Sequence, residues 1–227
     1  MDIMYKIETH LHTRPVSFCA YLPPEEMVEL HHKNGYYTIF VSDHFAINHF
    51  SRLGDVSWQE KTQMLYDSYL RAKKRGDELR MTVLFSPELT LKNNHYLLYN
   101  VDLDFLNSRE DFFSLTIEEF HRYATEWGIS IIQAHPLRDG KCTPCPEFVI
   151  GYEVINSNPR HENFNDNVIA LANEHGLLIT AGSDAHRVED VNGAAVLSPF
   201  EIKSADDYLA LLRSGEAKLL LHGEIIV

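Results

Sequence analysis

The sequence has little that would cross-link a protein by disulfides or anchor it in a membrane. It holds three cysteines in 227 residues, an odd and small number that does not form a disulfide framework. No apolar run is long enough for a membrane helix, and the first residues, MDIMYKIETH, lack the apolar segment of a signal peptide. We therefore expect a cytoplasmic protein with reduced thiols and no membrane partner.

Positive charge is also scarce. Lys and Arg number 20 against 33 Asp and Glu, which gives a formal net charge of −13. This balance argues against a broad binding face for long nucleic acids, whose phosphates attract basic surfaces. A small phosphorylated substrate remains possible, because a few arginines and metal cations in a pocket reverse the local field. No feature of the sequence indicates an oligomeric state.

The chain lacks repeats, low-complexity tracts and Pro- or Gly-rich linkers, so we expect a single domain over residues 1–227. Hydrophobic residues make up 44% of it, which is ordinary for a chain that buries a large core. Short apolar runs typical of strands alternate with segments typical of helices. The predicted strands are YKIETHLHT, YYTIFVSDH, RMTVLFSPELT, HYLLYNVD, ISIIQAHP, VIGYEVINS, GLLITAGSDAH and AKLLLHGEIIV.

Helix start and stop signals bound most of the segments between these strands. Thr116 and Glu119 have the spacing of a capping box, and their helix should end at the glycine that follows. The predicted helices span residues 23–35, 57–80, 116–128, 163–176 and 204–215. The alternation predicts right-handed βαβ units around a parallel sheet, either closed into a barrel or open and doubly wound. In both cases functional residues lie at the carboxyl ends of the strands.

Histidines and carboxylates gather at those strand ends. His10 and His12 are separated by one residue, so both side chains project from the same face of a strand. The whole set is His10, His12, Asp43, His44, Glu88, His95, His135, Asp184 and His186. Imidazole together with carboxylate suits Zn, Mn or Fe, so the set predicts a site for more than one divalent metal ion. We expect the remaining histidines to be solvated or capping residues; they are His31, His32, His49, His121, His161, His175 and His222.

The pieces that carry these residues resemble the PHP family, the polymerase and histidinol phosphatase domain. They are ETHLHT, VSDH, SPE, NNHYLLY, QAHP and GSDAH, in family order. The stretch NSNPRHENFN is similar to one found in the stand-alone bacterial PHP phosphoesterases. The resemblance implies a distorted seven-stranded (β/α)7 TIM-like barrel. It also implies two or three divalent metal ions that hydrolyse phosphoesters.

The resemblance also implies metal ligands by position. The first ion is assigned to His10, His12, Glu88 and Asp184, the second to Glu88, His95 and His135, and the third to His44 and His186. Glu88 would bridge two ions. The chain departs from the family pattern at Glu8, where Asp is usual, and in TRPVSFCAYLPP, which lacks the usual ligand of the third ion. Ser17 and Cys19 are candidate substitutes, and absence of the third ion is the alternative.

The predicted function is hydrolysis of a small phosphomonoester, similar to histidinol phosphate or a nucleotide, through a metal-bridging hydroxide. The predicted catalytic residues are Glu88 and Asp43, which either orients a metal ligand or protonates the leaving alcohol. The arginines predicted to hold the phosphate are Arg14, Arg160 and Arg187, with Arg138 as a further candidate.

Two alternatives remain open. An amidohydrolase-type enzyme also begins with H-x-H on a barrel, but it usually carries a bridging Lys, and here no Lys follows His95 until Lys141. A catalytically inactive, metal-stabilised module is the other alternative, although nearly all the ligand positions are filled. Cys142 and Cys145 form a single C-x-x-C, which we interpret as incidental because no second pair accompanies it.

Overall fold

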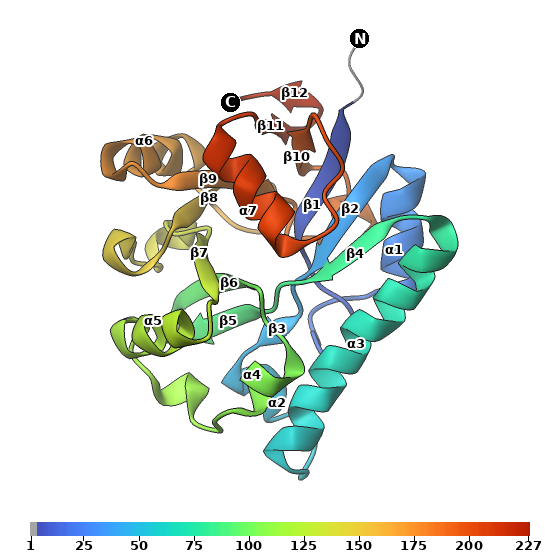
Figure 1. Cartoon of the computed structure of the whole chain (residues 1–227), viewed down its shortest axis with the longest axis vertical. Helices are drawn as coiled ribbons and strands as arrows, with labels where there is room; N and C mark the ends of the chain where they lie inside the picture. The colour runs from blue at the N-terminus through green and yellow to red at the C-terminus, as the bar shows by residue number, and fades with distance from the viewer. Residues whose placement is uncertain (1–3) are drawn as a thin grey trace.

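Two six-stranded sheets, with helices packed outside them, make up the computed structural model, which describes residues 4–227 (Figure 1). The first sheet has the order β12-β11-β10-β1-β2-β4 and the second the order β3-β5-β6-β7-β8-β9. The strands of the first are β1 (Tyr5–Leu11), β2 (Tyr36–Val41), β4 (Thr82–Phe85), β10 (Ala194–Ser198), β11 (Lys218–Leu221) and β12 (Glu224–Ile225). The strands of the second are β3 (His44–Phe45), β5 (Glu88–Leu91), β6 (Asn94–Tyr99), β7 (Ser130–Ala134), β8 (Gly151–Asn156) and β9 (Leu178–Gly182).

All five predicted helices are present, and two further short helices, at Ile47–Phe50 and Leu103–Asn107, were not predicted. The helices are α1 (Pro24–Lys33), α2 (Ile47–Phe50), α3 (Trp58–Leu79), α4 (Leu103–Asn107), α5 (Ile117–Glu126), α6 (Asn165–His175) and α7 (Ala205–Ser214). Capping boxes begin α3 at Ser57 and α5 at Thr116, so the side chains supply the hydrogen bonds that the first helical turn lacks. Between residues 4 and 227, no helix combines the length and the apolar character needed to cross a membrane.

The sheets are mixed rather than parallel throughout, which corrects the expected series of βαβ units. Parallel pairs join β1, β2 and β4, and also β7, β8 and β9. However, β5, β6 and β7 run antiparallel, as do β1, β10, β11 and β12. Strands β5 and β6 are joined by a two-residue turn, since Leu91 pairs with Asn94, and such a turn leaves no room for a crossover helix. Strand β10 was not predicted.

The two sheets meet along β1 and the end of β9. The His12 amide donates to the carbonyl of Ala185 (2.9 Å), and the Ala185 amide donates to that of His10 (3.3 Å). On the other side the chain passes from β4 directly into β5 across Ser86 and Pro87, so RMTVLFSPELT forms two strands in different sheets. The predicted mixed α/β class is confirmed. The closed seven-stranded barrel stays a prediction, because the hydrogen bonds define two sheets with one bridge between them.

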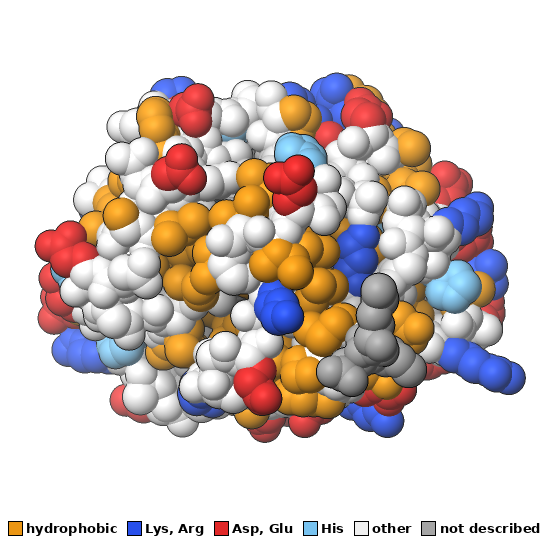
Figure 2. Space-filling view, turned by 90° about the horizontal axis from the view of Figure 1, so that it is seen from above, with side chains coloured by type: hydrophobic (Ala, Val, Ile, Leu, Met, Phe, Trp, Pro, Cys, Tyr) orange, Lys and Arg blue, Asp and Glu red, His pale blue; other side chains and the backbone are white. Residues whose placement is uncertain are grey.

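Apolar packing fills the space between the sheets and helices. The largest fully buried side chains include Phe40, Tyr96, Tyr99, Phe105 and Tyr152. Seen from above, hydrophobic side chains also gather toward the middle of one face of the molecule (Figure 2). The main apolar core lies between the strands and the helices. Buried polar residues lie at the carboxyl ends of β1, β2 and β9.

The close approach of β9 to β1 requires a residue without a side chain at position 182. A Cβ on Gly182 would lie 2.5 Å from Glu153 Oε1 and 2.5 Å from the Cβ of His10. We expect Gly182→Ala to lower the free energy of unfolding by about 1–3 kcal/mol, because the strands must separate. Chemical denaturation measures this. Gly35→Asn is the control, since Gly35 has a positive φ that Asn adopts and no atom near its Cβ position. Equal stability of the two variants would contradict the close approach.

Candidate metal centre

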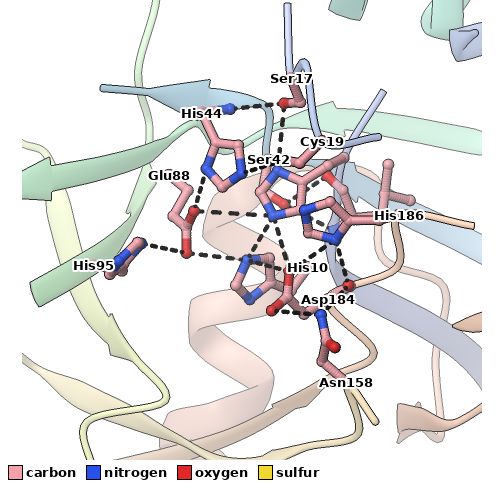
Figure 3. A network of polar contacts seen from close by, with 12 residues as sticks. His10, Ser17, Cys19, Ser42, His44, Glu88, His95, Asn158, Asp184 and His186 are labelled. Atoms are coloured by element: carbon pink, nitrogen blue, oxygen red, sulfur yellow. Dashed lines mark hydrogen bonds and ion pairs between the residues drawn. The ribbon is translucent and has the colours of Figure 1, made fainter. Parts of the chain in front are cut away.

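A cleft of about 690 Å³ opens at the carboxyl ends of the strands, where the two sheets meet. Five of the eight predicted metal ligands line it, namely His44, Glu88, His95, Asp184 and His186. The other three, His10, His12 and His135, are buried in contact with Glu88 or Asp184. Glu88 lies between the imidazoles of His44 and His95, with His10 beside them (Figure 3). Residues far apart in the sequence thus form a single cluster.

The carboxylate of Glu88 is at the centre of this cluster. Its Oε1 lies 3.3 Å from His10 Nε2, 3.2 Å from His95 Nδ1 and 3.2 Å from His135 Nε2. Its Oε2 lies 2.7 Å from His44 Nδ1. The two oxygens therefore face different groups of imidazoles, which is the arrangement that a bridging carboxylate requires.

The H-x-H pair has the geometry of two ligands to one ion. His10 Nε2 and His12 Nε2 lie 3.1 Å apart, and both side chains are fully buried. His12 Nε2 is also 3.0 Å from Asp184 Oδ1. Two nitrogens bound at about 2.0–2.1 Å to one tetrahedral ion would lie roughly 3.3 Å apart. The observed separation fits that value.

Opposing effects shift the pKa values of these buried groups. Burial alone would lower the pKa of His10, but the carboxylates of Glu153, Asp184 and Glu88 outweigh it and raise that pKa well above its usual range. Burial and the charges of neighbouring imidazoles lower the pKa of His12. Burial would raise the pKa of Glu88, yet the surrounding imidazoles bring it well below the usual range. The carboxylates are thus ionised and depend on nearby positive charge.

A second group of charges lies around Cys19. Desolvation alone would raise the pKa of this thiol, but hydrogen bonds with His186, His44 and His49 outweigh it and lower the pKa to about 4. Burial would lower the pKa of His44, whereas the charge of Glu88 and the hydrogen bond with Cys19 raise it to about 10. The thiol of Cys19 and the imidazole of His44 therefore each favour the charged form of the other.

The donor atoms fit divalent transition metals. Within residues 4–227, the sets of ligand atoms that lie within 4.8 Å of one another are His10/His12/Glu88, Glu88/His95/His135, His12/His44/His186, His10/His135/Glu153 and Cys19/His44/His49. Within the described chain no hydrogen bond reaches the buried atoms Glu88 Oε2 and His135 Nδ1, although His44 Nδ1 faces Glu88 Oε2 at 2.7 Å. Such orphaned polar atoms are costly, and a cation held by imidazole and carboxylate would satisfy Glu88.

Two buried carboxylates outside the predicted ligand set, Glu153 and Glu8, support the ligands. Glu153 Oε1 lies 2.9 Å from His10 Nδ1, and its Oε2 accepts the His135 amide (3.1 Å). Glu8 Oε1 accepts the amides of His10 (3.0 Å) and Ser183 (2.9 Å). These bonds orient the imidazole of His10 and tie β1 to the end of β9. An acidic residue inside the apolar run VIGYEVINS was the available signal for Glu153.

Asp43 lies behind the cleft rather than in it, which argues against its predicted role as a proton donor. Its Oδ1 accepts from the Thr13 amide (2.5 Å) and the Ser17 hydroxyl (2.7 Å), and its Oδ2 from the hydroxyls of Thr13 (2.6 Å) and Ser68 (2.8 Å). Burial raises its pKa, although these hydrogen bonds partly oppose the effect. Asp43 therefore holds the 13–17 segment beside His12 and His44.

The four arginines differ in position. Arg138 is committed to a predicted ligand, since its Nη2 lies 2.7 Å from Asp184 Oδ2. Arg160 forms a two-pronged pair with Asp190 at 2.7 Å for both contacts. Arg187 lines the cleft, and its guanidinium lies over Tyr21 at 4.6 Å from the ring centre. Arg14 is exposed and is not among the residues that line the cleft, so its predicted contact with phosphate is not supported.

The expectation of solvated histidines is wrong for His31 and His49, which are both buried. His31 Nδ1 bonds the Met27 carbonyl (2.8 Å) within α1, and its Nε2 lies 3.6 Å from Glu8 Oε2. His49, at α2, lines the cleft, and its ring lies 4.2 Å from that of His44. His49 does not lie at a strand end, because a short helix brings it to the site.

Comparison with known proteins agrees with the predicted resemblance. A family model described as PHP-associated matches residues 162–217, which include Asp184 and His186. No curated protein matches the sequence significantly. The family resemblance is confirmed by this match together with the fold of the solved structures that follow.

Three solved structures illustrate the likeness. A two-domain protein from Bacteroides vulgatus containing a predicted PHP-like metal-dependent phosphoesterase has a TM-score of 0.71 and 14% identity, over 99% of this chain and 67% of that one. PsfC from Pseudomonas syringae gives 0.69 and 18%, over 96% and 91%. An amidohydrolase from Chromobacterium violaceum, with sulfate and no metal, gives 0.56 and 13%, over 96% and 98%. At such identities the likeness establishes the fold.

We expect metal binding to release protons. His10 and His44 have raised pKa values in the metal-free chain, so they carry protons near pH 7 that a metal ion must displace. Titration calorimetry with zinc in buffers of different ionisation enthalpy should report net proton release. The release should diminish as the pH rises toward 10, the pKa of His44. Proton uptake on binding would contradict the assignment of these imidazoles as ligands.

Proposed function

We propose that this chain, which has the fold of PHP-like metal-dependent phosphoesterases, hydrolyses a small phosphomonoester with two or three divalent metal ions. One observation carries the proposal: both oxygens of the buried Glu88 carboxylate face imidazoles, on either side, beneath an open cleft. A structural cluster would be sealed by apolar residues, whereas this one is open to a ligand.

The charge of the cleft supports an anionic substrate. The chain as a whole carries a net charge of −13, yet Lys92, Lys141 and Arg187 all line the cleft. Within residues 4–227, neither lysine forms an ion pair. Arg187 Nη1 approaches Glu189 only to 3.8 Å, and its Nε has no hydrogen-bond partner. The cleft thus carries positively charged side chains although the net charge of the chain is negative, as a site for a phosphate group requires.

The size of the cleft supports a small substrate. Its volume of about 690 Å³ is in the range of roughly 300–1,000 Å³ that is usual for small-molecule sites. A nucleotide or a compound of the size of histidinol phosphate fits this volume. The acidic surface argues against a long nucleic acid as substrate.

Divalent ions bound here would supply a water molecule of lowered pKa and neutralise charge on the phosphate oxygens. The side chains of the protein position the reaction. Glu153 fixes the ring of His10, and Arg138 with Asn158 fixes the carboxylate of Asp184. Arg187 is near enough to the ligands to bind the non-bridging oxygens of the phosphate.

An amidohydrolase-type reaction is the second candidate, favoured by the likeness to the amidohydrolase from Chromobacterium violaceum. The two candidates differ in substrate. Phosphate release from p-nitrophenyl phosphate and a panel of phosphomonoesters, measured with Mn, Zn or Fe restored separately, supports the first. Hydrolysis of amides alone supports the second, and metal uptake without hydrolysis of either class supports an inactive module.

We expect Glu88→Gln to lower phosphatase activity by about a hundredfold or more, because the amide cannot donate negative charge to two ions. Elemental analysis should show fewer metal ions per chain in this variant. Glu118→Gln, at an exposed position of α5, is the matched control and should keep both activity and metal content. Full activity of Glu88→Gln would reject the bridging role.

Arg187→Gln should raise KM for a phosphomonoester by about tenfold with a smaller change in kcat, which corresponds to about 1.4 kcal/mol of lost binding. Arg14→Gln is the matched control, since Arg14 lies outside the lining of the cleft. Steady-state kinetics with one substrate and saturating metal measures both constants. If Arg14→Gln raises KM and Arg187→Gln does not, the assignment of the phosphate subsite is wrong.

A further inference from the structure

Four potential ligands surround one corner of the cleft, and two of them lie outside the pattern of strand ends. Cys19 Sγ lies 3.2 Å from His44 Nε2, and ligand atoms of Cys19, His44 and His49 all lie within 4.8 Å of one another. His186 lies beside Cys19 (Figure 3), and its ring centre is 5.7 Å from that of His44. The thiol of Cys19 and the imidazoles of His44 and His49 therefore face a common point, with the imidazole of His186 beside them.

The Nδ1 atoms of the three imidazoles have different partners. His186 Nδ1 is 2.8 Å from the Asp184 carbonyl, and His44 Nδ1 faces Glu88 Oε2 at 2.7 Å, whereas His49 Nδ1 lies 3.3 Å from both the Val16 carbonyl and the Phe18 amide. For His186, a proton on Nδ1 that donates to the carbonyl leaves the lone pair on Nε2. This is the arrangement by which proteins orient a histidine for metal binding.

The loop that carries Cys19 is held in place by backbone bonds. The Ala20 amide donates to the Ser17 carbonyl (2.9 Å), and the Tyr21 amide donates to the His186 carbonyl (2.8 Å). The second bond ties the loop directly to the segment that follows β9. Cys19 is thus fixed beside His186 by the fold, rather than by a metal ion alone.

Ser17 is unsuited to the same task. Its hydroxyl donates to Asp43 Oδ1 (2.7 Å) and accepts the His44 amide (3.0 Å). Both of its hydrogen-bonding functions are therefore used in supporting the loop. Ser17 Oγ also lies 3.5 Å from His12 Nδ1, but of the two candidate substitutes only Cys19 lines the cleft, with Sγ 3.2 Å from His44 Nε2.

We propose that Cys19, His44 and His49 hold a thiolate-binding divalent cation such as zinc, with His186 beside the thiol. Thiolate and imidazole are ligands that zinc takes, whereas a thiolate is unsuited to magnesium, calcium or manganese. The proposal deepens the proposed function, since it gives the third metal position of the same centre a ligand set of its own. Its test does not depend on activity.

Cobalt substitution tests the proposal. Metal-free protein loaded with Co(II) should develop the intense near-ultraviolet absorption of a thiolate–cobalt bond. Cys19→Ser should lose this absorption and about one cobalt per chain. Cys19→Asp should keep the cobalt, because a carboxylate is also a ligand, but lose the absorption. Cys142→Ser is the matched control and should keep both, since Cys142 lines the same cleft but donates to the backbone carbonyl of Asn93.

His49→Gln tests the least expected ligand. It should reduce cobalt content by about the same amount as Cys19→Ser, with an unchanged circular dichroism spectrum showing that the variant folds. Absence of thiolate–cobalt absorption in the wild-type chain, or its persistence in Cys19→Ser, would overturn the proposal. So would wild-type cobalt content and absorption in His49→Gln. A wild-type chain that hydrolyses phosphoesters without this absorption would keep the proposed function and reject only the thiolate site.

Discussion

The buried carboxylate of Glu88 is the group on which the rest of the centre depends. It has almost no access to water, and four imidazole nitrogens lie within 3.3 Å of its oxygens. A carboxylate in such a place would be protonated unless positive charge were close. Protonated imidazoles supply that charge in the metal-free chain, and cations would supply it in the loaded one. Burial of the Glu88 carboxylate is therefore costly without nearby positive charge, and for the same reason the site favours cations.

The architecture shows which backbone and side-chain hydrogen bonds offset the cost of burying these charged groups. The centre lies at the bridge between the two sheets, where backbone bonds link His10 and His12 to the segment after β9. Glu8 and Glu153 accept backbone amides on both sides of that bridge. The acidic groups that orient the ligands thus also stabilise the junction of the sheets. Fold and site share their hydrogen bonds, so a change at the junction alters the ligands as well.

Much of this could be predicted from the sequence, because strand ends meet at one edge of a sheet. His10, His135 and Asp184 directly follow or end apolar runs, and each lies in the centre as predicted. The strand pairing could not be predicted. The segment RMTVLFSPELT has one continuous apolar pattern, but it forms two strands that belong to different sheets. The two roles left open for Asp43 have a related cause: position at a strand end does not fix the direction of a side chain, and in the fold Asp43 faces the loop.

His49 and Cys19 mark the limit of reasoning from motifs. The expected ligand of the third ion is missing from the segment after H-x-H, and a search by spacing finds nothing in its place. In the fold these residues are brought together by proximity rather than by spacing in the sequence. Helix α2 carries the imidazole of His49, and the loop whose Ser17 donates to Asp43 carries the thiol of Cys19. A metal position is thus defined by where donor atoms converge. Because sulfur is softer than the oxygen or nitrogen it replaces, the exchange alters which cation the corner prefers, while Glu88 and its imidazoles remain unchanged.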